Sequence, residues 1–477
     1  MNRAILNRLS AVCRFRLKPW QMSVIGWAVL AVSLFIAARY YKHPLFYSWR
    51  SLEMPVLLLV AFGGAWLARR VSCSASGRWR RLEAGLYFVC SLLLMGLVAG
   101  QEGVFRWQQY QVWQASAAVK LIGEHFVVGF RDFDEVKPLA ERGLIGGIYI
   151  TRRNLRGETV QSLRAHIDEL QMLRQRAGLP PLFVMADQEG GKVAHLSPLI
   201  ERMPALATLP GEGRENLEAR ARDYGERQGR ALAALGINMN LSPVVDLKIA
   251  KQGNWLNLHT QIESRAIDAD PEIVTMVAAA YGAGLLDSGV LPTVKHFPGL
   301  GRVKGDTHLV KVDLEVGAPE RAADWQPFRE VTARTGAAMM LGHVRLPDID
   351  PEKPASLSRT LVQNVLRKKG GEGWNYQGVL ITDDLNMGAV YDEGIGEAAI
   401  SALDAGVDLI LISYDPDQYY RAIYAVAEAW RSGAMNAERE SGSAARLGRY
   451  WVRESGIRNQ GSEKQRGAPS PLCTSDT

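Results

Sequence analysis

"LPTVKHF", residues 291–297, is a largely apolar run that ends in two ionisable side chains, Lys295 and His296, followed by one aromatic residue. β-branched and aromatic residues favour strands. A run that is apolar on both faces indicates a strand buried on both sides, as in the parallel sheets of α/β proteins. The stretch therefore predicts a buried parallel strand with ionisable groups near its carboxyl end.

Seven more runs of this kind follow one another between residues 120 and 415, and helix-prone stretches separate them. They cover residues 126–130, 146–151, 181–188, 237–247, 337–344, 378–384 and 408–413. Strands that alternate with helices pair in parallel, so eight such units predict an α/β fold of the (β/α)8 TIM-barrel type. A doubly wound open sheet is the alternative. It is less favoured because no glycine-rich phosphate fingerprint joins a first strand to a first helix.

Ionisable residues stand at the carboxyl ends of five consecutive runs. In chain order they are Asp187, Asp246, Lys295 with His296, His343, and Asp383 with Asp384. In a TIM barrel the chemistry lies on the loops at this end of the strands. Because the interiors of the runs are almost free of charge, we expect these side chains to line one pocket.

The loop "KHFPGLGRVKGDTH" (295–308) holds two of the eight histidines of the chain. A metal site, a phosphate cradle, a solvated turn and a proton-transfer device are the interpretations to weigh. A metal needs three or four converging ligands, and the first run, "FVVGF", offers none. The phosphate loop's Gly-Lys-Ser/Thr context is missing. Asp306 two residues from His308 predicts an acid/base pair, because a carboxylate fixes the imidazole tautomer and leaves the other nitrogen to exchange protons. No metal or other cofactor is expected.

Three uncharged apolar stretches, residues 20–38, 54–68 and 84–100, precede the barrel. The first and third reach the roughly 17 to 25 residues of a membrane helix, and the second is shorter. They predict about three transmembrane helices. A cleaved signal peptide fits poorly, because two more stretches follow the first. Buried helices of a soluble domain are the other alternative, which the flanking arginines disfavour.

Basic residues alternate in number along this region. The tail has Arg3, Arg8, Arg14, Arg16 and Lys18; the next loop has Arg39, Lys42 and Arg50; the third has Arg69, Arg70, Arg78, Arg80 and Arg81. The alternation predicts a cytoplasmic N-terminus, so three crossings place the barrel on the periplasmic or outer side of a bacterial-type inner membrane. If the second stretch does not span, the barrel returns to the cytoplasm. Nucleic-acid binding is not expected, because the formal charge of +6 is not gathered on one element.

The expected organisation has four parts. They are a basic cytoplasmic tail (1–19), a membrane region (20–105), a catalytic barrel (106–435), and a C-terminal part (436–477) that finishes a helix and continues as a disordered tail. Cysteines 13, 73, 90 and 473 all lie outside residues 101–435 and show neither zinc nor disulfide spacing.

Four motifs then identify a resemblance. "DQEGGKV" (187–193), "KHFPG" (295–299), "GDTH" (305–308) and "LITDDLNMGAV" (380–390) resemble, in order and position, the motifs of family 3 glycoside hydrolases. The similarity covers about residues 120–430 and is closest to the β-N-acetylglucosaminidase (β-N-acetylhexosaminidase) branch. Two departures stand out: Leu300 replaces a histidine of the branch's loop, and "IESRAID" (262–268) replaces a Gly-Asp-Arg-Ser-Phe pattern.

The resemblance implies a role for each matched residue. Asp383 is the implied nucleophile that forms a glycosyl-enzyme, and His308, oriented by Asp306, is the implied acid/base. The residues implied to bind the terminal sugar are Asp187, Arg265, Lys295 and His296.

The implied activity is that of a retaining β-N-acetylglucosaminidase acting on terminal β-linked N-acetylglucosamine of glycans such as peptidoglycan fragments, with the lipid bilayer as a partner of the N-terminal helices. A β-glucosidase or glycoside phosphorylase is one alternative, since a histidine acid tolerates an incoming phosphate better than a carboxylate does. A non-catalytic, membrane-anchored glycan-binding protein is the other, because of the altered loop.

Overall fold

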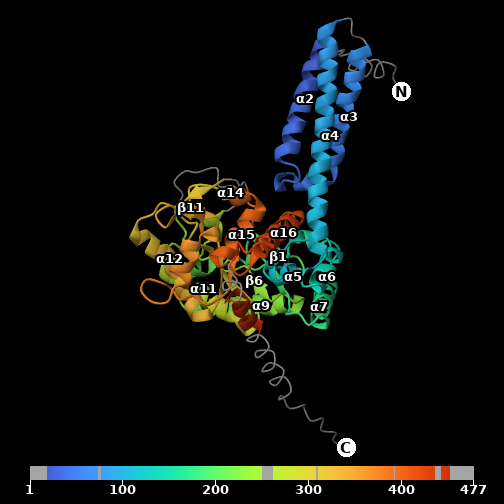
Figure 1. The fold of residues 1–477 in the computed structure, drawn as a ribbon. Helices are drawn as coiled ribbons and strands as arrows, with labels where there is room; N and C mark the ends of the chain where they lie inside the picture. Colours follow the sequence, from blue (N-terminus) through green and yellow to red (C-terminus); the bar gives the residue numbers. More distant parts are fainter. Residues whose placement is uncertain are drawn as a thin grey trace, which may run out of the picture. The chain divides into compact units, whose positions relative to one another are not determined.

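The computed structural model of the chain describes residues 19–73, 77–249, 261–307, 310–391, 393–435 and 442–451. The chain forms two compact units that divide between Gln108 and Gln109 (Figure 1). His308 lies outside the described residues, as do residues 1–18 of the basic tail and residues 452–477 of the C-terminal tail. The predictions made for those residues stay predictions.

The first unit consists of long apolar helices. They are α2 (Pro19–Arg39), α3 (Arg50–Cys73) and α4 (Arg78–Trp113), with the short helix η1 (Pro44–Trp49) after α2. All three long helices have the length and composition to cross a membrane, including the one that contains the short second stretch. They expose large apolar side chains such as Val24, Leu59 and Leu93. Helices that are apolar all round are typical of membrane spans.

The second unit is built on a sheet of eight parallel strands in the order β12-β9-β7-β6-β3-β2-β1-β13. The strands are β1 (Phe126–Val128), β2 (Gly147–Ile150), β3 (Phe183–Ala186), β6 (Met239–Asn240), β7 (Leu291–Phe297), β9 (Ala338–Leu341), β12 (Leu380–Thr382) and β13 (Ile410–Ile412). A parallel bridge between Ile381 and Leu409 joins the two ends of the sheet. The predicted (β/α)8 barrel is confirmed, and each predicted run contributes one of the eight strands.

Several strands are shorter than the runs that predicted them. Residues 237–247 contain only β6, which ends at Asn240, shortly before Pro243. Proline has no N–H to donate to a neighbouring strand, so it ends regular pairing inside a sheet. The chain beyond it still follows β7 through a bridge between Val244 and Lys295.

Helices surround the strands (Figure 1). The main ones are α6 (Phe133–Glu141), α7 (Val160–Arg176), α9 (Leu217–Leu235), α11 (Pro271–Asp287), α12 (Ala318–Thr335), α15 (Ile395–Ala405) and α16 (Asp417–Arg431), with α5 (Ala117–Gly123) preceding β1. One apolar core lies between the helices and the strands, and a second, containing Val127, Phe183 and Met340, fills the barrel. Such an interior is a packed core rather than a pore, so a ligand must bind at one of the barrel's ends.

Smaller elements decorate the loops that follow the strands. They are the hairpin β4 (Gln188–Gly190) with β5 (Val193–Ala194), the helices α8 (Thr208–Gly211), α10 (Ile262–Arg265), α13 (Arg359–Leu361) and α14 (Gly388–Tyr391), and a small sheet of β8 (Val312–Asp313), β10 (Val344–Leu346) and β11 (Asp350–Pro354). These elements extend the carboxyl end of the barrel, where the predicted pocket lies.

Residues 442–451 form a further helix at the amino-terminal end of the strands. Leu447 belongs to the core inside the barrel, and the rings of Tyr450 and Trp451 lie 5.1 and 4.5 Å from the ring of Phe183 at the start of β3. Figure 1 shows this helix, in dark red, at the end of the barrel opposite α14 and β11. The C-terminal part of the chain therefore closes the base of the barrel instead of only finishing the preceding helix.

Candidate active site

The carboxyl edge of the sheet gathers the ionisable residues predicted from the sequence. Asp187 directly follows β3, and Asp383 directly follows β12. Lys295 and His296 lie near the carboxyl end of β7. All eight strands run parallel, so these positions share one end of the barrel. Arg265 reaches the same place from α10, and its Nη2 lies 3.4 Å from Nε2 of His296.

A buried chain of ion pairs forms the floor of this site. The Lys295 ammonium contacts Asp187 and lies 2.7 Å from Oε1 of Glu189. Arg265 binds the same Glu189 with two hydrogen bonds, 2.9 Å from Nε to Oε2 and 2.7 Å from Nη2 to Oε1. Lys295 is 2% exposed and Glu189 6%. These ion pairs thus join Asp187, Lys295 and Arg265, three of the predicted sugar-binding residues, through Glu189. Glu189 belongs to the "DQEGGKV" motif but was not predicted as a site residue.

The neighbouring charges keep all four groups ionised. Burial alone would raise the pKa of the Asp187 carboxyl, but Lys295 and His195 hold it well below its usual value. Burial opposes ionisation of Glu189 too, and Arg265 and Lys295 lower its pKa. Burial would lower the pKa of Lys295, whereas Asp187 and Glu189 raise it. Two anions and two cations cancel, so the floor is polar but neutral overall, which suits an uncharged, hydroxyl-rich ligand.

Asp246 holds His296 and the backbone of Leu300 in place beside the ion-pair floor. Its Oδ2 lies 2.8 Å from Nδ1 of His296, and its Oδ1 accepts a 2.7 Å hydrogen bond from the backbone N–H of Leu300. A carboxylate at Nδ1 keeps the proton on that nitrogen, which leaves Nε2 to accept hydrogen bonds. The Leu300 side chain, which replaces the histidine expected from the resemblance to the branch, is 6% exposed and packs in the apolar core.

Tyr149 forms a hydrogen bond with the second carboxylate oxygen of Asp187. Its hydroxyl donates a 2.6 Å hydrogen bond to Oδ2 and lies 3.3 Å from Nδ1 of His195. Burial and the nearby Asp187 raise the pKa of Tyr149 well above its usual value, so it stays a donor. Neither Tyr149 nor His195 was selected from the sequence. The signal for Tyr149 was its place near the end of a predicted strand.

The two aspartates after β12 have different surroundings. Asp384 accepts hydrogen bonds at Oδ2 from the Ser413 hydroxyl at 2.6 Å and the Tyr414 N–H at 2.9 Å, so it braces the loop after β13. Asp383 is partly exposed, and its Oδ1 accepts a 2.8 Å hydrogen bond from the Asp384 N–H. His343 links two loops, because its ring nitrogens lie 2.7 Å from the Ser356 hydroxyl and 3.0 Å from the Asp384 carbonyl.

The loop that carries Asp306 runs beside the segment after Asp383. Asp306 and Thr307 are buried, and the Thr307 carbonyl accepts a 3.3 Å hydrogen bond from the N–H of Ala389 in α14. The start of the loop is held by Arg302, whose Nε lies 2.9 Å from Oδ2 of Asp324 in α12. Asp306, the residue predicted to orient the acid/base, therefore lies at the same end of the barrel as Asp383. In the part of the chain that the structure describes, no group of three or more His, Cys, Asp or Glu side chains could hold a metal ion.

Comparison with known sequences decides the family. The profile of the glycosyl hydrolase family 3 N-terminal domain matches residues 118–449. The chain belongs to glycoside hydrolase family 3. The family resemblance predicted from the four motifs is confirmed, and the chain is a glycoside hydrolase.

Two relatives of this family 3 member are β-hexosaminidases. The chain is 35% identical over 297 residues to the β-hexosaminidase of Neisseria gonorrhoeae, which is 61% of this chain and 77% of that one. It is 34% identical over 293 residues to the β-hexosaminidase LpqI of Mycobacterium tuberculosis, 61% of this chain and 71% of that one. These similarities place the chain in the β-N-acetylhexosaminidase branch of the family.

Solved structures agree with this placement. A family 3 β-N-acetylglucosaminidase from a Paenibacillus species superposes with a TM-score of 0.64 at 31% identity, covering 75% of this chain and 65% of that one. The β-N-acetylhexosaminidase of Beutenbergia cavernae gives a TM-score of 0.62 at 28% identity, covering 71% of this chain and 98% of that one. This chain therefore spans slightly less than two thirds of the Paenibacillus protein and nearly all of the Beutenbergia one.

Proposed function

We propose that this family 3 glycoside hydrolase is a retaining β-N-acetylglucosaminidase that removes terminal β-linked N-acetylglucosamine from glycans, peptidoglycan fragments among them. The observation that carries the proposal is the ion-pair floor of Asp187, Lys295, Glu189 and Arg265 at the same barrel end as Asp383. The β-hexosaminidase relatives support the choice of sugar.

The proposed reaction has two displacements. In the first, the Asp383 carboxylate attacks the anomeric carbon while His308 donates a proton to the departing glycosidic oxygen. In the second, His308 takes a proton from water, the water attacks the anomeric carbon, and the bond to Asp383 breaks. Asp306 stabilises the His308 imidazolium, which donates the proton in the first step and forms again when His308 takes a proton from water in the second. The roles of His308 and Asp306 rest on the "GDTH" motif.

Substrate binding follows from the donor and acceptor inventory of the floor. Arg265 and Lys295 offer N–H donors, Asp187 and Glu189 offer carboxylate acceptors, and His296 offers Nε2 as an acceptor. Vicinal sugar hydroxyls both donate and accept, so paired donors and acceptors suit them. The matching donors also suit the carbonyl oxygen of an N-acetyl group.

Turnover of an aryl β-N-acetylglucosaminide by the purified full chain tests the proposal. Asp383→Asn should lower kcat by at least about 10³-fold, since a neutral amide is a poor nucleophile. Asp223→Asn, which changes an exposed carboxylate on α9, is the matched control and should keep full activity. NMR of the first product should show the β-anomer.

Each alternative gives a different result in the same assay. If the first product were the α-anomer, the mechanism would be inverting and not the proposed two-step retaining one. Sugar 1-phosphate formed only in phosphate buffer would make the protein a phosphorylase, and faster turnover of the aryl glucoside would make it a β-glucosidase. Saturable sugar binding without turnover would make it a glycan-binding protein. Release of N-acetylglucosamine from peptidoglycan fragments tests the natural substrate.

We also propose that the three long helices anchor the enzyme in a bacterial-type inner membrane, with a cytoplasmic N-terminus and the barrel on the outer side. The support is the length and apolar character of α2, α3 and α4, together with the arginines that flank them. Two cations between the end of α2 and the start of α3 are paired within the unit, Lys42 with Glu102 at 3.3 Å and Arg50 with Glu53 at 3.1 Å.

A further inference from the structure

A cavity of about 600 Å³ lies at the amino-terminal end of the barrel. Its walls come from the turns before β7 and β9, the segment of residues 374–379 before β12, one side of α12, and the helix of residues 442–451. β7, β9 and β12 are neighbours in the sheet, so the cavity is one continuous hollow beneath three adjacent strands. Its volume falls within the roughly 300 to 1,000 Å³ of ligand sites.

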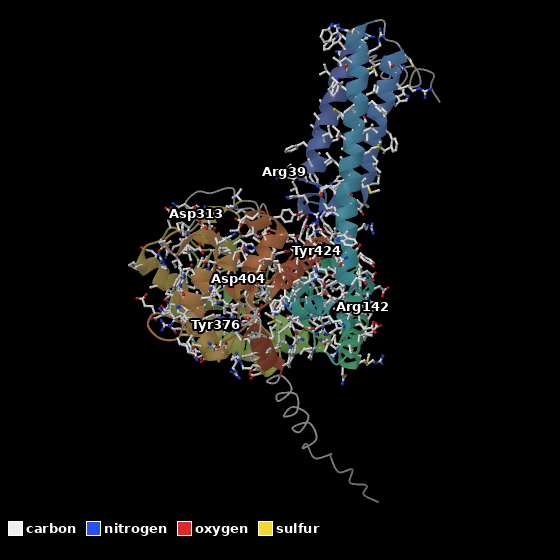
Figure 2. The ribbon with its side chains drawn as sticks, in the orientation of Figure 1. Arg39, Arg142, Asp313, Tyr376, Asp404 and Tyr424 are labelled. Carbon is white, nitrogen blue, oxygen red and sulfur yellow. The ribbon has the colours of Figure 1, made fainter. Side chains whose placement is uncertain are left out.

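This cavity is separate from the candidate active site. Lys295 and Asp383 belong to the carboxyl ends of β7 and β12, whereas the cavity opens at the amino ends of the same strands. In Figure 2, Asp313 of β8 lies towards the upper edge of the barrel and Tyr376 of the cavity towards the lower edge. The packed interior of the barrel lies between the two ends.

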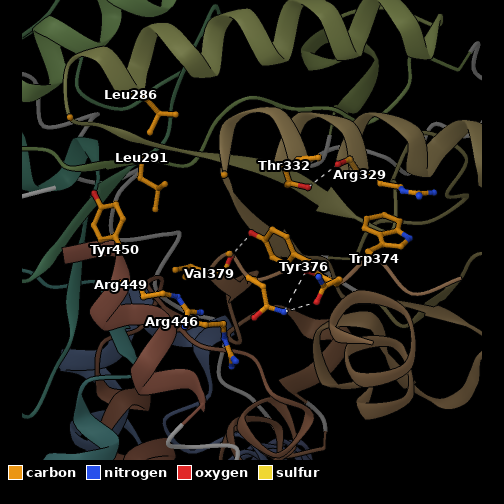
Figure 3. Close-up of a pocket in the computed structure, with 16 residues that line it drawn as sticks. Leu286, Leu291, Arg329, Thr332, Trp374, Tyr376, Val379, Arg446, Arg449 and Tyr450 are labelled. Carbon is orange, nitrogen blue, oxygen red and sulfur yellow. Dashed lines mark hydrogen bonds between the residues drawn. The ribbon is translucent and has the colours of Figure 1, made fainter. Parts of the chain in front are cut away.

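Aromatic rings form much of the cavity wall. Trp374, Tyr376 and Tyr450 line it together with Leu286 and Leu291 (Figure 3). Both tyrosine hydroxyls are already bonded to backbone carbonyls, that of Tyr376 to Ala337 at 2.7 Å and that of Tyr450 to Asn238 at 3.0 Å. These rings therefore offer apolar surface to a ligand and not a free hydroxyl.

Arginines supply the charge of the cavity. Figure 3 shows Arg446 and Arg449 on one helix and Arg329 on α12 across the cavity from them. The side chains of Arg329 and Arg449 are exposed and have no ion-pair partner among the described residues. Arg446 is tied to Asp408, which Arg367 also pairs with. No Asp or Glu of the described chain lines the cavity.

The sign of the local field follows from adding these charges. Helices α11 and α12 end beside the cavity, and each helix C-terminus carries about half a negative charge. Arg329 and Arg449 contribute two positive charges, and the cluster of Asp408 with two arginines contributes about one more. The positive charge exceeds the two helix ends by about two charges, so the cavity attracts anions.

We propose that this cavity is a second ligand site, which binds a small organic anion whose carboxylate or phosphate is attached to an aromatic group. The positive charge of Arg329 and Arg449 attracts the anionic group, and the aromatic part packs against the ring-lined wall. Both parts contribute to binding, because the aromatic rings carry no charge to attract an anion and the guanidinium groups offer little apolar surface.

Isothermal titration calorimetry of the full chain in detergent micelles tests this proposal, with 1-naphthyl phosphate as the probe and empty micelles as the blank. We expect saturable 1:1 binding that is at least about tenfold tighter than that of inorganic phosphate or of 1-naphthol. Arg329→Gln and Arg449→Gln should each weaken binding at least about fivefold. Arg176→Gln, which removes another exposed arginine without a described partner, should leave it unchanged.

Four outcomes overturn the proposal. They are no saturable binding, displacement of the probe by N-acetylglucosamine, undiminished binding in the Arg329→Gln/Arg449→Gln double variant, and 1-naphthol or phosphate binding as tightly as the probe. Both arginines are exposed, so the variants should fold, and thermal unfolding of each confirms it. Asp383→Asn should bind the probe like the unaltered chain, which keeps this result independent of the proposed hydrolysis.

Discussion

Glu189 is the single residue on which the floor of the active site depends. It lies within ion-pair distance of both Arg265 and Lys295, and all three side chains are buried or nearly so. Removing one partner of a buried ion pair leaves an uncompensated charge, which costs about 3 to 5 kcal/mol. We therefore expect Glu189 to affect both stability and, at the proposed site, sugar binding.

We expect Glu189→Gln to lower the free energy of unfolding by about 3 kcal/mol and to lower kcat/KM on an aryl β-N-acetylglucosaminide by about 10²-fold. The amide keeps an acceptor for Arg265 but cannot neutralise either cation. Denaturant unfolding and steady-state kinetics measure the two effects. Glu215→Gln, an exposed position, is the control. Unchanged kcat/KM in the folded variant would show that the floor does not bind substrate.

Asp324 gives the protein a specific pH dependence of stability. Burial raises the pKa of its carboxyl to about 6, although Arg302 opposes the shift. In the unfolded chain an aspartate titrates near 4, so between about pH 4 and pH 6 the folded state holds a proton that the unfolded state has released. Stability from this group therefore rises as the pH falls through that window.

The free energy of unfolding measured at pH 7 and at pH 5 checks this sign. The unaltered chain should gain about 1.4 kcal/mol more than Asp324→Asn on going from pH 7 to pH 5, since one pH unit below the pKa corresponds to about 1.4 kcal/mol. The asparagine does not titrate, and other groups contribute equally to both proteins. An equal pH response would contradict the raised pKa.

Single residues also show what the sequence predicted and what it did not. The pattern of ionisable strand ends selected Asp187, Lys295 and His296, and the structure brings them together with Arg265. Glu189 was missed because its role depends on the β4–β5 hairpin, which turns it toward Lys295. Tyr149 stands near the end of a predicted strand, but this position alone does not distinguish its hydroxyl from that of a core tyrosine.

Among the elements, the helix of residues 442–451 is fastened mainly by Asp408. This fully buried carboxylate pairs with Arg367 at 2.8 Å and Arg446 at 2.7 Å and accepts a hydrogen bond from Ser443. Burial alone would raise its pKa, but the two arginines lower it. The element was only partly predicted from the sequence, because its apolar residues Leu447, Tyr450 and Trp451 stand among many polar ones.

We expect Asp408→Asn to lower the free energy of unfolding by about 3 to 5 kcal/mol, because two buried or half-buried arginines lose their counter-charge. Arg449→Gln on the same helix is the matched control and should change it by less than about 0.5 kcal/mol, as exposed substitutions usually do. Denaturant titration measures both. If Asp408→Asn were as mild as the control, the helix would not be fastened through this carboxylate.

At the scale of the whole molecule, the sequence predicted eight strands, the barrel and the apolar helices before it, because these features repeat over many residues. A pattern that repeats along the sequence can be recognised even where a single residue departs from it. The cavity beneath β7, β9 and β12, in contrast, is formed by turns that are far apart in the chain. No local pattern marks such a hollow. The cavity forms only when the sheet closes into a barrel and brings these turns together.

The native cysteines test the proposed membrane topology. Cys73 is exposed at the end of α3, and Cys473 lies in the C-terminal tail. In variants that keep one cysteine each, a membrane-impermeant maleimide should label Cys473 in intact spheroplasts and Cys73 only after permeabilisation, as three crossings require. Labelling of Cys73 alone in intact spheroplasts would place the barrel in the cytoplasm, through a reversed orientation or through a second stretch that does not span. Labelling of neither before lysis would place both cysteines, and with them the barrel, in the cytoplasm.

The hydrogen bond from Leu300 to Asp246 uses the main chain and not the side chain. The bend after "KHFPG" can thus survive the exchange of a histidine for leucine, since every residue except proline brings the same amide. We therefore expect substitution of Asp246, which accepts this amide, to disturb the bend more than substitution of Leu300 does.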